Sequence, residues 1–532
     1  MEDAHRVCGT EYCYGTGKPD AAGARRSRSQ NEAGGGLKKF FAVMLAGTAS
    51  AQQSLLPADI VSETQDAPAA PAAPRIQVPT VPVPSPAAQR PLPKLSGEQA
   101  ALLAQLLGKD TNEQGLRFSG KAAPAPADND ALVRAALDHA KAVRAGRLDT
   151  ADFQADWALR PQPYDPYPSF VQAVSADRLG QWFAELPPPW AGYEGLRKGL
   201  ATYRGIAAKG GWKTIPAGPD MGLGAKGARV AALRERLAVE DNAVAVGGTT
   251  YDEGLRAAVQ RAQRRYGLNP TGVVSTGTLA ALNVPVATRV RQIMANMERW
   301  RWLPSELPKD RIQVNIAAAV MTVFEGDQPV MSMKAVTGKP GGGETPMLSS
   351  TIHSVVLNPP WNVPAGIAKR ELFPKGAGYL KANGFRVIGE GDSARLQQAS
   401  GDTSALGRFK FDFDNPFAVY LHDTPAKGGF SRFDRLASHG CIRLEKPNAL
   451  AKRLLRDVPE WNEAAIDELT TTSTKTVRAK LNTPVAVYLL YWTAFASGNG
   501  QINFRDDPYG WDAKLADKIE NRSAVQTQVA SR

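Results

Sequence analysis

The hydrophobic pattern of the chain changes near residue 310. Before this point, apolar residues recur every three or four positions, which predicts helices with one buried face. In the stretch ALVRAALDHAKAVRAG, Leu132, Ala136 and Ala140 lie on one such face, and Gly146 is placed to end the helix. We therefore predict a helical scaffold over residues 129–225, with these aromatic side chains in its core: Trp182, Phe183, Trp190, Tyr193 and Tyr203.

A separate unit of three short amphipathic helices is predicted over residues 226–284. ARVAALRERLAV gives the first helix. YDEGLRAAVQRAQRRYGL gives the second, with Leu255, Val259 and Ala262 on one face and Gly267 at its end. The third helix follows in STGTLAALN, where Ser275 is the expected N-cap.

From about residue 310 to 495, apolar and polar residues alternate, which is typical of β-strands. Ile312, Val314 and Ile316 alternate in this way, and Glu325-Gly326-Asp327 fits a hairpin turn. Further strands are predicted in SSTIHSVVLNPP, FKFDFDNPFAVYLHD and PVAVYLLYWTAFA. We assign one β-rich domain to residues 285–495. The polar, glycine-containing stretch 365–408 is expected to be an insertion that covers a site as a lid.

The two ends of the chain differ in composition from these regions. LKKFFAVMLAGTASAQQ, residues 37–53, combines two lysines, a short apolar run and an A-x-A pattern, which predicts a secretory signal cleaved after Ala51. Residues 1–51 are then an N-terminal extension with a signal peptide, and 52–128 a Pro/Ala-rich linker with one short helical piece at 98–107. Residues 496–532 are expected to form a polar tail, weakly structured after Asp507. We expect no transmembrane segment in the mature chain, because no apolar run approaches the roughly 20 residues that a membrane-spanning helix needs.

Charge and cysteine content narrow the possible functions. The chain has 532 residues and a net charge of +12, which suits an anionic partner such as a cell-wall polymer. It has no long Lys/Arg run and no zinc-finger spacing, so we expect no nucleic-acid partner. Cleavage after Ala51 would remove Cys8 and Cys13 and leave Cys441 alone, without an internal disulfide. This thiol is then either an inert core residue or a nucleophile.

The stretch ASHGCIRLEKP favours a nucleophile, because a thiol needs a nearby base to attack a carbonyl. Only five histidines are present, and two lie near Cys441: His422, at the end of a predicted strand, and His439, two positions before the cysteine. Gly440 permits a close backbone turn, and the amides around Gly440 and Cys441 are candidates for an oxyanion hole. Arg443 shares a face with Cys441 in extended chain and suits a substrate carboxylate.

A zinc site is the alternative interpretation of the same residues. His422, His439 and Cys441 are all possible zinc ligands. The sequence has neither a fourth ligand at a characteristic spacing nor an H-E-x-x-H motif. We therefore expect no metal and no organic cofactor.

A family resemblance supports the nucleophile interpretation. The string His422-Asp423-Thr424-Pro425, followed by Ser438-His439-Gly440-Cys441-Ile442-Arg443-Leu444, resembles the signature of the L,D-transpeptidase family. The stretches ERWRWLP (298–304), NPPWNVP (358–364) and NPF (415–417) resemble its large, lidded branch, and QRRYGL (263–268), TGVV (271–274) and TLAAL (278–282) resemble a peptidoglycan-binding module. The resemblance implies a multidomain α+β protein with a helical scaffold, a peptidoglycan-binding module and a β-sandwich catalytic domain.

The resemblance also implies roles for individual residues. Cys441 would be the nucleophile and His422 the proton acceptor and donor, oriented by the backbone carbonyl of Asp423, where small members of the family often have Ser or Gly. His439 and Gly440 would shape the oxyanion hole. The implied substrate contacts are Arg443, Trp361, Tyr420 and Asn362.

The implied reaction joins peptidoglycan stem peptides. A tetrapeptide stem would acylate Cys441, and an amine on a second stem would accept the acyl group and form a 3→3 cross-link. The implied partners are stem peptides and glycan strands, the implied location is the periplasm or cell wall, and carbapenems are the expected inhibitors. Two alternatives remain: an exported cysteine hydrolase of stem peptides, and a non-catalytic wall-binding protein. Sequence does not choose between a second stem, water, a D-amino acid and a protein lysine as acceptor.

Overall fold

The computed structural model describes residues 90–530 apart from 119–125, 127, 392 and 393, with side chains as far as residue 521. The expected signal peptide and most of the Pro-rich stretch lie outside these residues. All elements below belong to a unit that includes Leu92–Arg532. Among the described residues, no helix is both long and apolar enough to cross a membrane.

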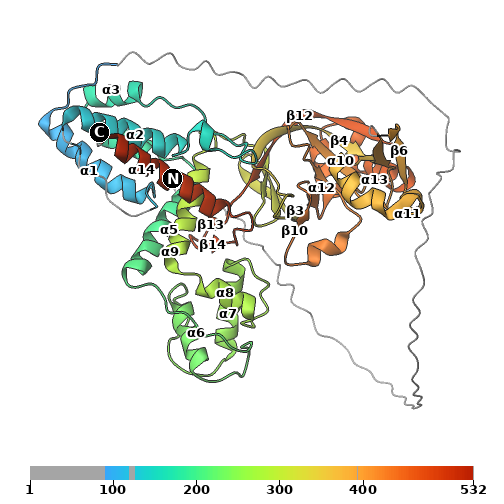
Figure 1. Ribbon diagram of the computed structural model, residues 1–532, viewed down its shortest axis with the longest axis horizontal. Helices are drawn as coiled ribbons and strands as arrows, with labels where there is room; N and C mark the ends of the chain where they lie inside the picture. Colours follow the sequence, from blue (N-terminus) through green and yellow to red (C-terminus); the bar gives the residue numbers. More distant parts are fainter. Residues whose placement is uncertain (1–89, 119–125, 127, 392–393, 531–532) are drawn as a thin grey trace, which may run out of the picture. The chain divides into compact units, whose positions relative to one another are not determined.

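Three helices of the predicted scaffold share one apolar core: α2 (Asn129–Ala145), α3 (Tyr167–Ser175) and α4 (Leu179–Glu185). A further helix, α1 (Gly97–Glu113), joins this core and lies beside α2 in Figure 1. The predicted face of α2 is buried, since Leu132, Ala136 and Ala140 are at most 7% exposed. Helix α2 ends at Ala145, before the predicted stop at Gly146, which has φ +87°. A 3-10 turn (Thr150–Asp152) and α5 (Ala191–Ala208) complete the region.

Helix α1 lies inside the stretch assigned to the linker and is longer than the short helical piece expected there. Ser96 and Gln99 form a reciprocal capping box at its start. Its Leu103 is completely buried in the core shared with α2, α3 and α4. Helical structure is therefore present well before residue 129.

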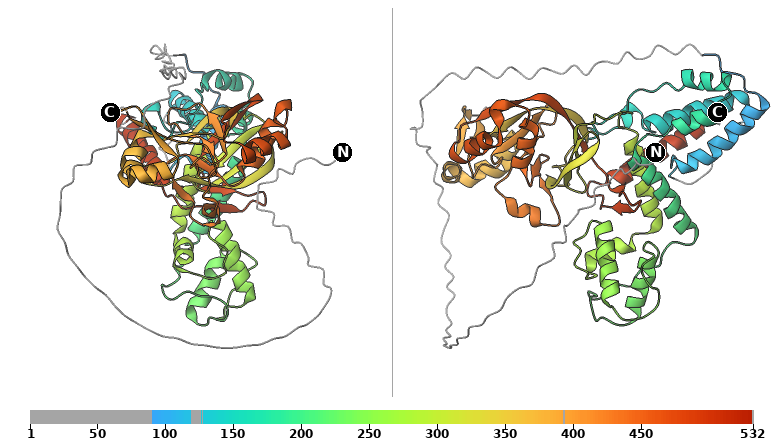
Figure 2. Two further views of the ribbon diagram at one scale, coloured as in Figure 1. Left: turned by 90° about the vertical axis from the view of Figure 1, so that its right-hand side faces the viewer. Right: turned by 180° about the vertical axis from the view of Figure 1, so that it is seen from behind.

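The three-helix unit consists of α6 (Ala228–Ala238), α7 (Glu253–Arg265) and α8 (Thr276–Asn283), which group together in both views of Figure 2. Ser275 caps α8 as predicted, with its hydroxyl accepting from Thr278 N. Glu240, whose side chain is 4% exposed, accepts hydrogen bonds from Tyr203 of α5 at 2.5 Å and from Arg236 of α6 at 2.7 Å. The bond from Tyr203 joins the unit to α5.

Helix α9 (Val286–Trp300) leads into a β-rich domain. Within the described residues, its main sheet has nine strands in the order β10-β3-β11-β9-β8-β4-β12-β1-β2, and β2 also pairs with β3, so the sheet closes on itself. β4 and β12 run side by side in Figure 1. The strands are β1 (Arg311–Asn315), β2 (Val320–Glu325), β3 (Gln328–Gly338), β4 (Leu348–Leu357), β8 (Phe409–Phe413), β9 (Leu421–His422), β10 (Leu436–Ser438), β11 (Ile442–Leu444) and β12 (Val477–Leu490).

The chain between β9 and β12 also forms four helical segments: a 3-10 turn (Lys427–Ser431), α12 (Pro447–Leu455), a second 3-10 turn (Pro459–Trp461) and α13 (Glu463–Thr472). Ile312, Val314 and Ile316, whose alternation predicted a strand, are all completely buried. The expected hairpin turn at 325–327 joins β2 to β3. The prediction of a β-rich domain is confirmed.

The polar insertion forms a small subdomain, which we call the lid. It contains α10 (Ala365–Ile367), two short helical turns (Ala368–Leu372 and Phe373–Lys375) and α11 (Gly376–Ala382). A three-stranded sheet joins β5 (Trp361–Asn362), β7 (Arg395–Gln398) and β6 (Phe385–Ile388); Figure 1 shows α10, α11 and β6 grouped together. The lid has its own apolar core of Val363, Ala368, Leu372, Leu380 and Leu396.

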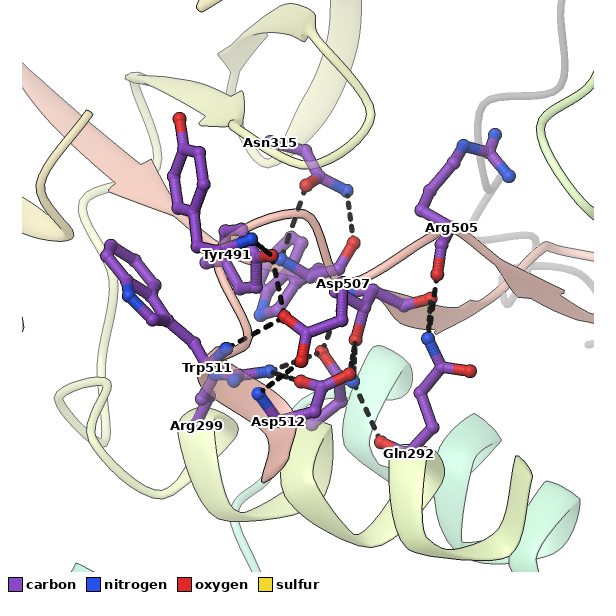
Figure 3. A network of polar contacts seen from close by, with 12 residues as sticks. Gln292, Arg299, Asn315, Tyr491, Arg505, Asp507, Trp511 and Asp512 are labelled. Carbon is purple, nitrogen blue, oxygen red and sulfur yellow. Dashed lines mark hydrogen bonds and ion pairs between the residues drawn. The ribbon is translucent and has the colours of Figure 1, made fainter. Parts of the chain in front are cut away.

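The expectation of weak structure after Asp507 is wrong. β13 (Ala494–Ala496) and β14 (Ile502–Phe504) form a hairpin, and α14 (Trp511–Ala530) follows. Trp511 is 2% exposed, and Leu515 and Ile519 one and two turns later are at most 1% exposed. Figure 3 shows Asp507 accepting from the backbone amides of Trp511 and Asp512, at 2.9 and 2.8 Å, and from the Tyr491 hydroxyl. We call residues 491–519 the C-terminal clasp.

Candidate active site

Three adjacent strands bring the candidate residues onto one face of the sheet. β9 lies between β8 and β11, and His422 pairs with Lys410 on one side and Arg443 on the other. Directly paired residues point to the same face, as do residues two positions apart on one strand. Tyr420 and Cys441, two positions before His422 and Arg443, therefore share this face with all three.

Tyr420 is the centre of this group. Its ring centroid lies 5.6 Å from that of His422 in an edge-on arrangement, and the Lys410 ammonium lies 4.3 Å from the centre of the Tyr420 ring. The pKa of Tyr420 is raised, chiefly by burial and then by the neighbouring Cys441 thiol. The structure thus brings together Cys441, His422, Tyr420 and Arg443.

His422 is held in one tautomer. The side chain is buried, and its Nδ1 lies 2.5 Å from the backbone oxygen of Asp423. Because a carbonyl oxygen can only accept, Nδ1 carries the proton and Nε2 has a free lone pair. Burial and, to a smaller extent, the positive charge of Arg443 together lower the pKa of His422 from 6.5 to about 3. The imidazole is therefore neutral at pH 7 and able to accept a proton.

The Asp423 carboxylate does not face the imidazole. It accepts hydrogen bonds from the backbone amides of Arg408 and Thr424, at 2.8 and 2.7 Å, and from the Lys427 ammonium at 2.5 Å. A Cβ at Gly407 would overlap this carboxylate. The side chain of Asp423 thus fixes the loop, while its backbone oxygen contacts His422.

Cys441 is half-buried, directly before β11. Burial raises the pKa of its thiol above the ordinary value of 9.0, although contacts with Tyr420 and the charges of Lys410 and Arg443 act in the opposite direction. Both shifts favour the uncharged forms, a neutral thiol and a neutral imidazole, over a thiolate–imidazolium pair.

The loop Ser438–Cys441 is fixed by its own hydrogen bonds. Gly440 has φ +112°, which favours glycine. Its amide donates to the Ser438 hydroxyl at 3.1 Å, and that hydroxyl donates to the Cys441 carbonyl at 2.6 Å. The Gly440 amide is thus already used, whereas the Cys441 amide has no protein acceptor among the described residues.

His439 contacts the lid instead of the thiol. Its Nε2 lies 2.8 Å from a carboxylate oxygen of Glu371. No group of three His, Cys, Asp or Glu side chains in the described part of the chain is arranged to hold a metal ion. The three residues of the zinc interpretation, His422, His439 and Cys441, do not form such a group.

The expected substrate-contact residues lie in different environments. Arg443 is half-buried, and within the described residues no carboxylate forms an ion pair with it. Trp361 is also half-buried, with its ring 6.2 Å from that of Phe385 in the lid. Asn362 is exposed, and its side-chain oxygen accepts from Gln397 at 2.7 Å. Arg443 therefore has no carboxylate partner within the described part of the chain, while the Asn362 side chain bonds to the lid sheet.

Lys410 was not predicted from the sequence, although a signal for it was present. In FKFDF, Phe409, Phe411 and Phe413 are buried and alternate with Lys410 and Asp412. The alternation places Lys410 on the face opposite the phenylalanines, and only the pairing of β8 with β9 places it beside His422.

Residues 309–487 match the family model described as the L,D-transpeptidase catalytic domain. The chain carries an L,D-transpeptidase catalytic domain. Residues 226–282, which contain α6, α7 and α8, match a model described as "Putative peptidoglycan binding domain", and residues 97–200 match one described as a scaffold domain. All the site residues above lie within the L,D-transpeptidase domain.

A curated relative from Haemophilus influenzae, named "Putative L,D-transpeptidase", is 30% identical over 245 residues, which are 42% of this chain and 49% of the relative. The match thus spans about half the length of that protein. Among solved structures, an L,D-transpeptidase of Xylanimonas cellulosilytica is 16% identical, covering 52% of this chain and 99% of that chain with a TM-score of 0.17. An L,D-transpeptidase of Mycobacterium smegmatis is 16% identical, covering 34% of this chain and 58% of that chain with a TM-score of 0.20.

Proposed function

We propose that this protein is an exported peptidoglycan L,D-transpeptidase that forms 3→3 cross-links through an acyl-enzyme on Cys441. One observation carries the proposal: Cys441 and His422 share a face of the sheet, and the Asp423 carbonyl leaves Nε2 of a neutral His422 as a proton acceptor. The match of residues 309–487 to the catalytic-domain model supports the reaction class.

In the first step, His422 Nε2 takes the thiol proton as the sulfur attacks the amide carbon after the third residue of a tetrapeptide stem. The carbonyl oxygen gains negative charge and is stabilised by the Cys441 amide. Collapse of this intermediate breaks the C–N bond. D-Ala leaves with the proton from His422, and a thioester remains on Cys441.

In the second step, an amine on another stem attacks the thioester. His422 accepts the amine proton and returns it to the departing sulfur, which restores the neutral pair. Water would compete as acceptor, so the acyl-enzyme must be shielded from solvent. The lid is the segment that we assign to this shielding, with Trp361 and Tyr420 as walls.

Substrate binding follows from the charges and domains of the chain. Arg443 and Lys410 are positioned for a stem carboxylate, and Arg443 offers the bidentate geometry that suits it. The three-helix unit would hold the glycan polymer, and the net charge of +12 favours an anionic partner. The protein would act in the periplasm or cell wall after removal of its signal peptide.

The decisive experiment is intact-mass spectrometry of the mature protein after exposure to a carbapenem, which mimics the acyl donor. We expect a covalent adduct on the wild type and none on Cys441→Ala. Absence of an adduct on wild-type protein with a reduced thiol would overturn the proposal and favour a non-catalytic wall-binding protein.

The acceptor is tested separately with purified tetrapeptide stems. We expect D-Ala release together with a cross-linked dimer in the mass spectrum. D-Ala release with tripeptide as the sole other product would instead identify a hydrolase, which would share the same acyl-enzyme.

A further inference from the structure

The backbone of the Ser438–Cys441 loop is anchored from outside by a threonine hydroxyl. Thr345 lies in the turn between β3 and β4 and is completely buried. Its hydroxyl accepts from the Gly338 amide at 2.9 Å and lies 2.7 Å from the Gly440 carbonyl oxygen. A hydroxyl has one proton to donate, and Gly338 N–H cannot accept it. The proton of Thr345 is therefore directed at the Gly440 oxygen.

This bond also fixes the direction of the Cys441 amide. Gly440 C=O and Cys441 N–H belong to the same planar trans peptide, in which they point in opposite directions. Because Thr345 holds the oxygen toward the buried β3–β4 turn, the N–H points away from that turn. It is the amide that has no protein acceptor in the described part of the chain.

A tyrosine from the C-terminal clasp fixes the β3–β4 turn itself. The Tyr509 hydroxyl donates to the Gly338 carbonyl at 2.6 Å and accepts from the Thr345 amide at 3.3 Å. Gly338 permits this close turn, since a Cβ there would overlap the Gly343 carbonyl. Tyr509 is in turn held by stacking on Tyr491, with centroids 5.1 Å apart. A continuous chain of contacts thus runs from the clasp through Thr345 to Gly440.

We propose that Thr345 and Tyr509 are positioning residues that aim the Cys441 amide at the oxyanion of the acylation step. This inference rests on the proposed acyl transfer and goes beyond it, because it gives the C-terminal clasp a role in positioning the oxyanion hole. Neither side chain touches the substrate. Both act only on reactions in which negative charge develops on a carbonyl oxygen.

Two reagents separate this role from general structural damage. Acylation by a carbapenem passes through an oxyanion, whereas alkylation by iodoacetamide displaces iodide at a saturated carbon and forms none. For Thr345→Val, which keeps the shape and removes the hydroxyl, we expect the acylation rate to fall about 10- to 100-fold. The alkylation rate should stay within about twofold of the wild type. Thr345→Ser retains the hydroxyl and is expected to restore most of the acylation rate.

Thr337 offers a matched control on β3, directly before Gly338. It is also completely buried, and its hydroxyl also donates to a backbone carbonyl, that of Ile316, at 3.0 Å. Thr337→Val loses the same groups without contacting the Ser438–Cys441 loop through its side chain. We expect its acylation rate to remain within about twofold of the wild type.

The outcomes distinguish this inference from the proposed function. No acylation of the wild type would overturn the proposed function. Normal acylation of both the wild type and Thr345→Val would overturn the role of Thr345 alone. Equal losses of acylation and alkylation in Thr345→Val would show a collapsed site and also contradict it. For Tyr509→Phe, which acts one bond further away, we expect a selective loss of acylation of about twofold to tenfold. An unchanged acylation rate would remove Tyr509 from the inference.

Discussion

At the scale of single residues, the protonation state of the Cys441–His422 pair determines how the thiol reacts. Burial moves the two pKa values further apart. The pKa of the thiol rises, and that of the imidazole falls to about 3. In a preformed ion pair the thiolate would already be present at neutral pH. In the proposed acyl transfer, the proton would therefore leave the sulfur only as the reaction proceeds.

This difference predicts the pH dependence of alkylation. We expect the rate of Cys441 alkylation by iodoacetamide to keep rising with pH through 8 and beyond, because only the thiolate reacts and the pKa of this thiol is raised. The rate would be followed by intact mass between pH 5 and 10. A rate plateau between pH 5 and 8 would indicate an ion pair and contradict the neutral pair.

The same burial of His422 links protein stability to pH. In the unfolded protein, the His422 imidazole binds a proton below its ordinary pKa of 6.5, whereas in the folded protein it does so only near pH 3. Between these values the unfolded state binds more protons, so His422 destabilises the fold as pH falls, by about 1.4 kcal/mol per pH unit. Urea unfolding between pH 4 and 7 would measure how the free energy of unfolding changes with pH. In His422→Gln this change should be smaller by about 1.4 kcal/mol per pH unit. Parallel curves for the two proteins would show that the folded imidazole titrates normally.

The sequence could indicate Cys441 and His422 because both belong to one short motif. Thr345 and Tyr509 could not be found in this way. Their hydroxyls reach Gly440 and Gly338 across separations of 95 and 171 residues, and no local pattern encodes such contacts. The contacts of the Asp423 carboxylate could not be predicted either. One of them is with the backbone amide of Arg408, which lies 15 residues earlier, directly before β8.

At the scale of elements, the lid has its own apolar core and contacts the Ser438–Cys441 loop through His439 and Glu371. Both side chains are partly exposed, so this pair contributes little to global stability. Its effect is expected on how well the lid excludes water from the thioester.

Glu371→Gln tests this effect. We expect the carbapenem adduct to be lost about twofold to tenfold faster than from the wild type, because a weaker contact exposes the thioester to water more often. The adduct would be followed by intact mass over time. Lys381→Gln is the control, since Lys381 is exposed on α11 of the lid and forms no ion pair within the described residues. Equal adduct lifetimes in Glu371→Gln and the wild type would rule out this role of the contact.

The elements also show which sequence patterns were informative. Alternation predicted the strands because one face of each is buried, as for Ile312 and Val314. The lid sheet was not predicted, since β5 and β7 pair across more than thirty residues of polar chain. The clasp was missed although its signal was present: Trp511, Leu515 and Ile519 recur every four residues on a helix whose other positions are mostly polar.

At the scale of the whole molecule, the clasp joins regions that the sequence suggested were independent. Asp512 accepts from Arg299 of α9 at 2.5 Å, a pair drawn in Figure 3. It also accepts from the Thr493 hydroxyl at 2.6 Å. Trp511 contacts Trp157 of the scaffold region at 6.1 Å between ring centroids and Tyr491 after β12 at 4.7 Å. One short segment therefore contacts the scaffold, the linking helix and the end of the catalytic sheet.

Trp511→Ala is expected to destabilise the full chain by about 3–5 kcal/mol, because it leaves a large cavity among buried aromatic rings. Since those rings belong to both the scaffold and the catalytic domain, the loss should lower the unfolding midpoint of both regions together. The two midpoints would be measured in urea. Far-ultraviolet circular dichroism reports on the helices, and Cys441 alkylation reports on the site. Lys514→Ala is the control on the same helix, where the side chain is exposed, and should change stability by less than about 0.5 kcal/mol. If only one of the two signals moved in Trp511→Ala, the clasp would stabilise that region alone, and the acylation chemistry would not depend on the integrity of the scaffold.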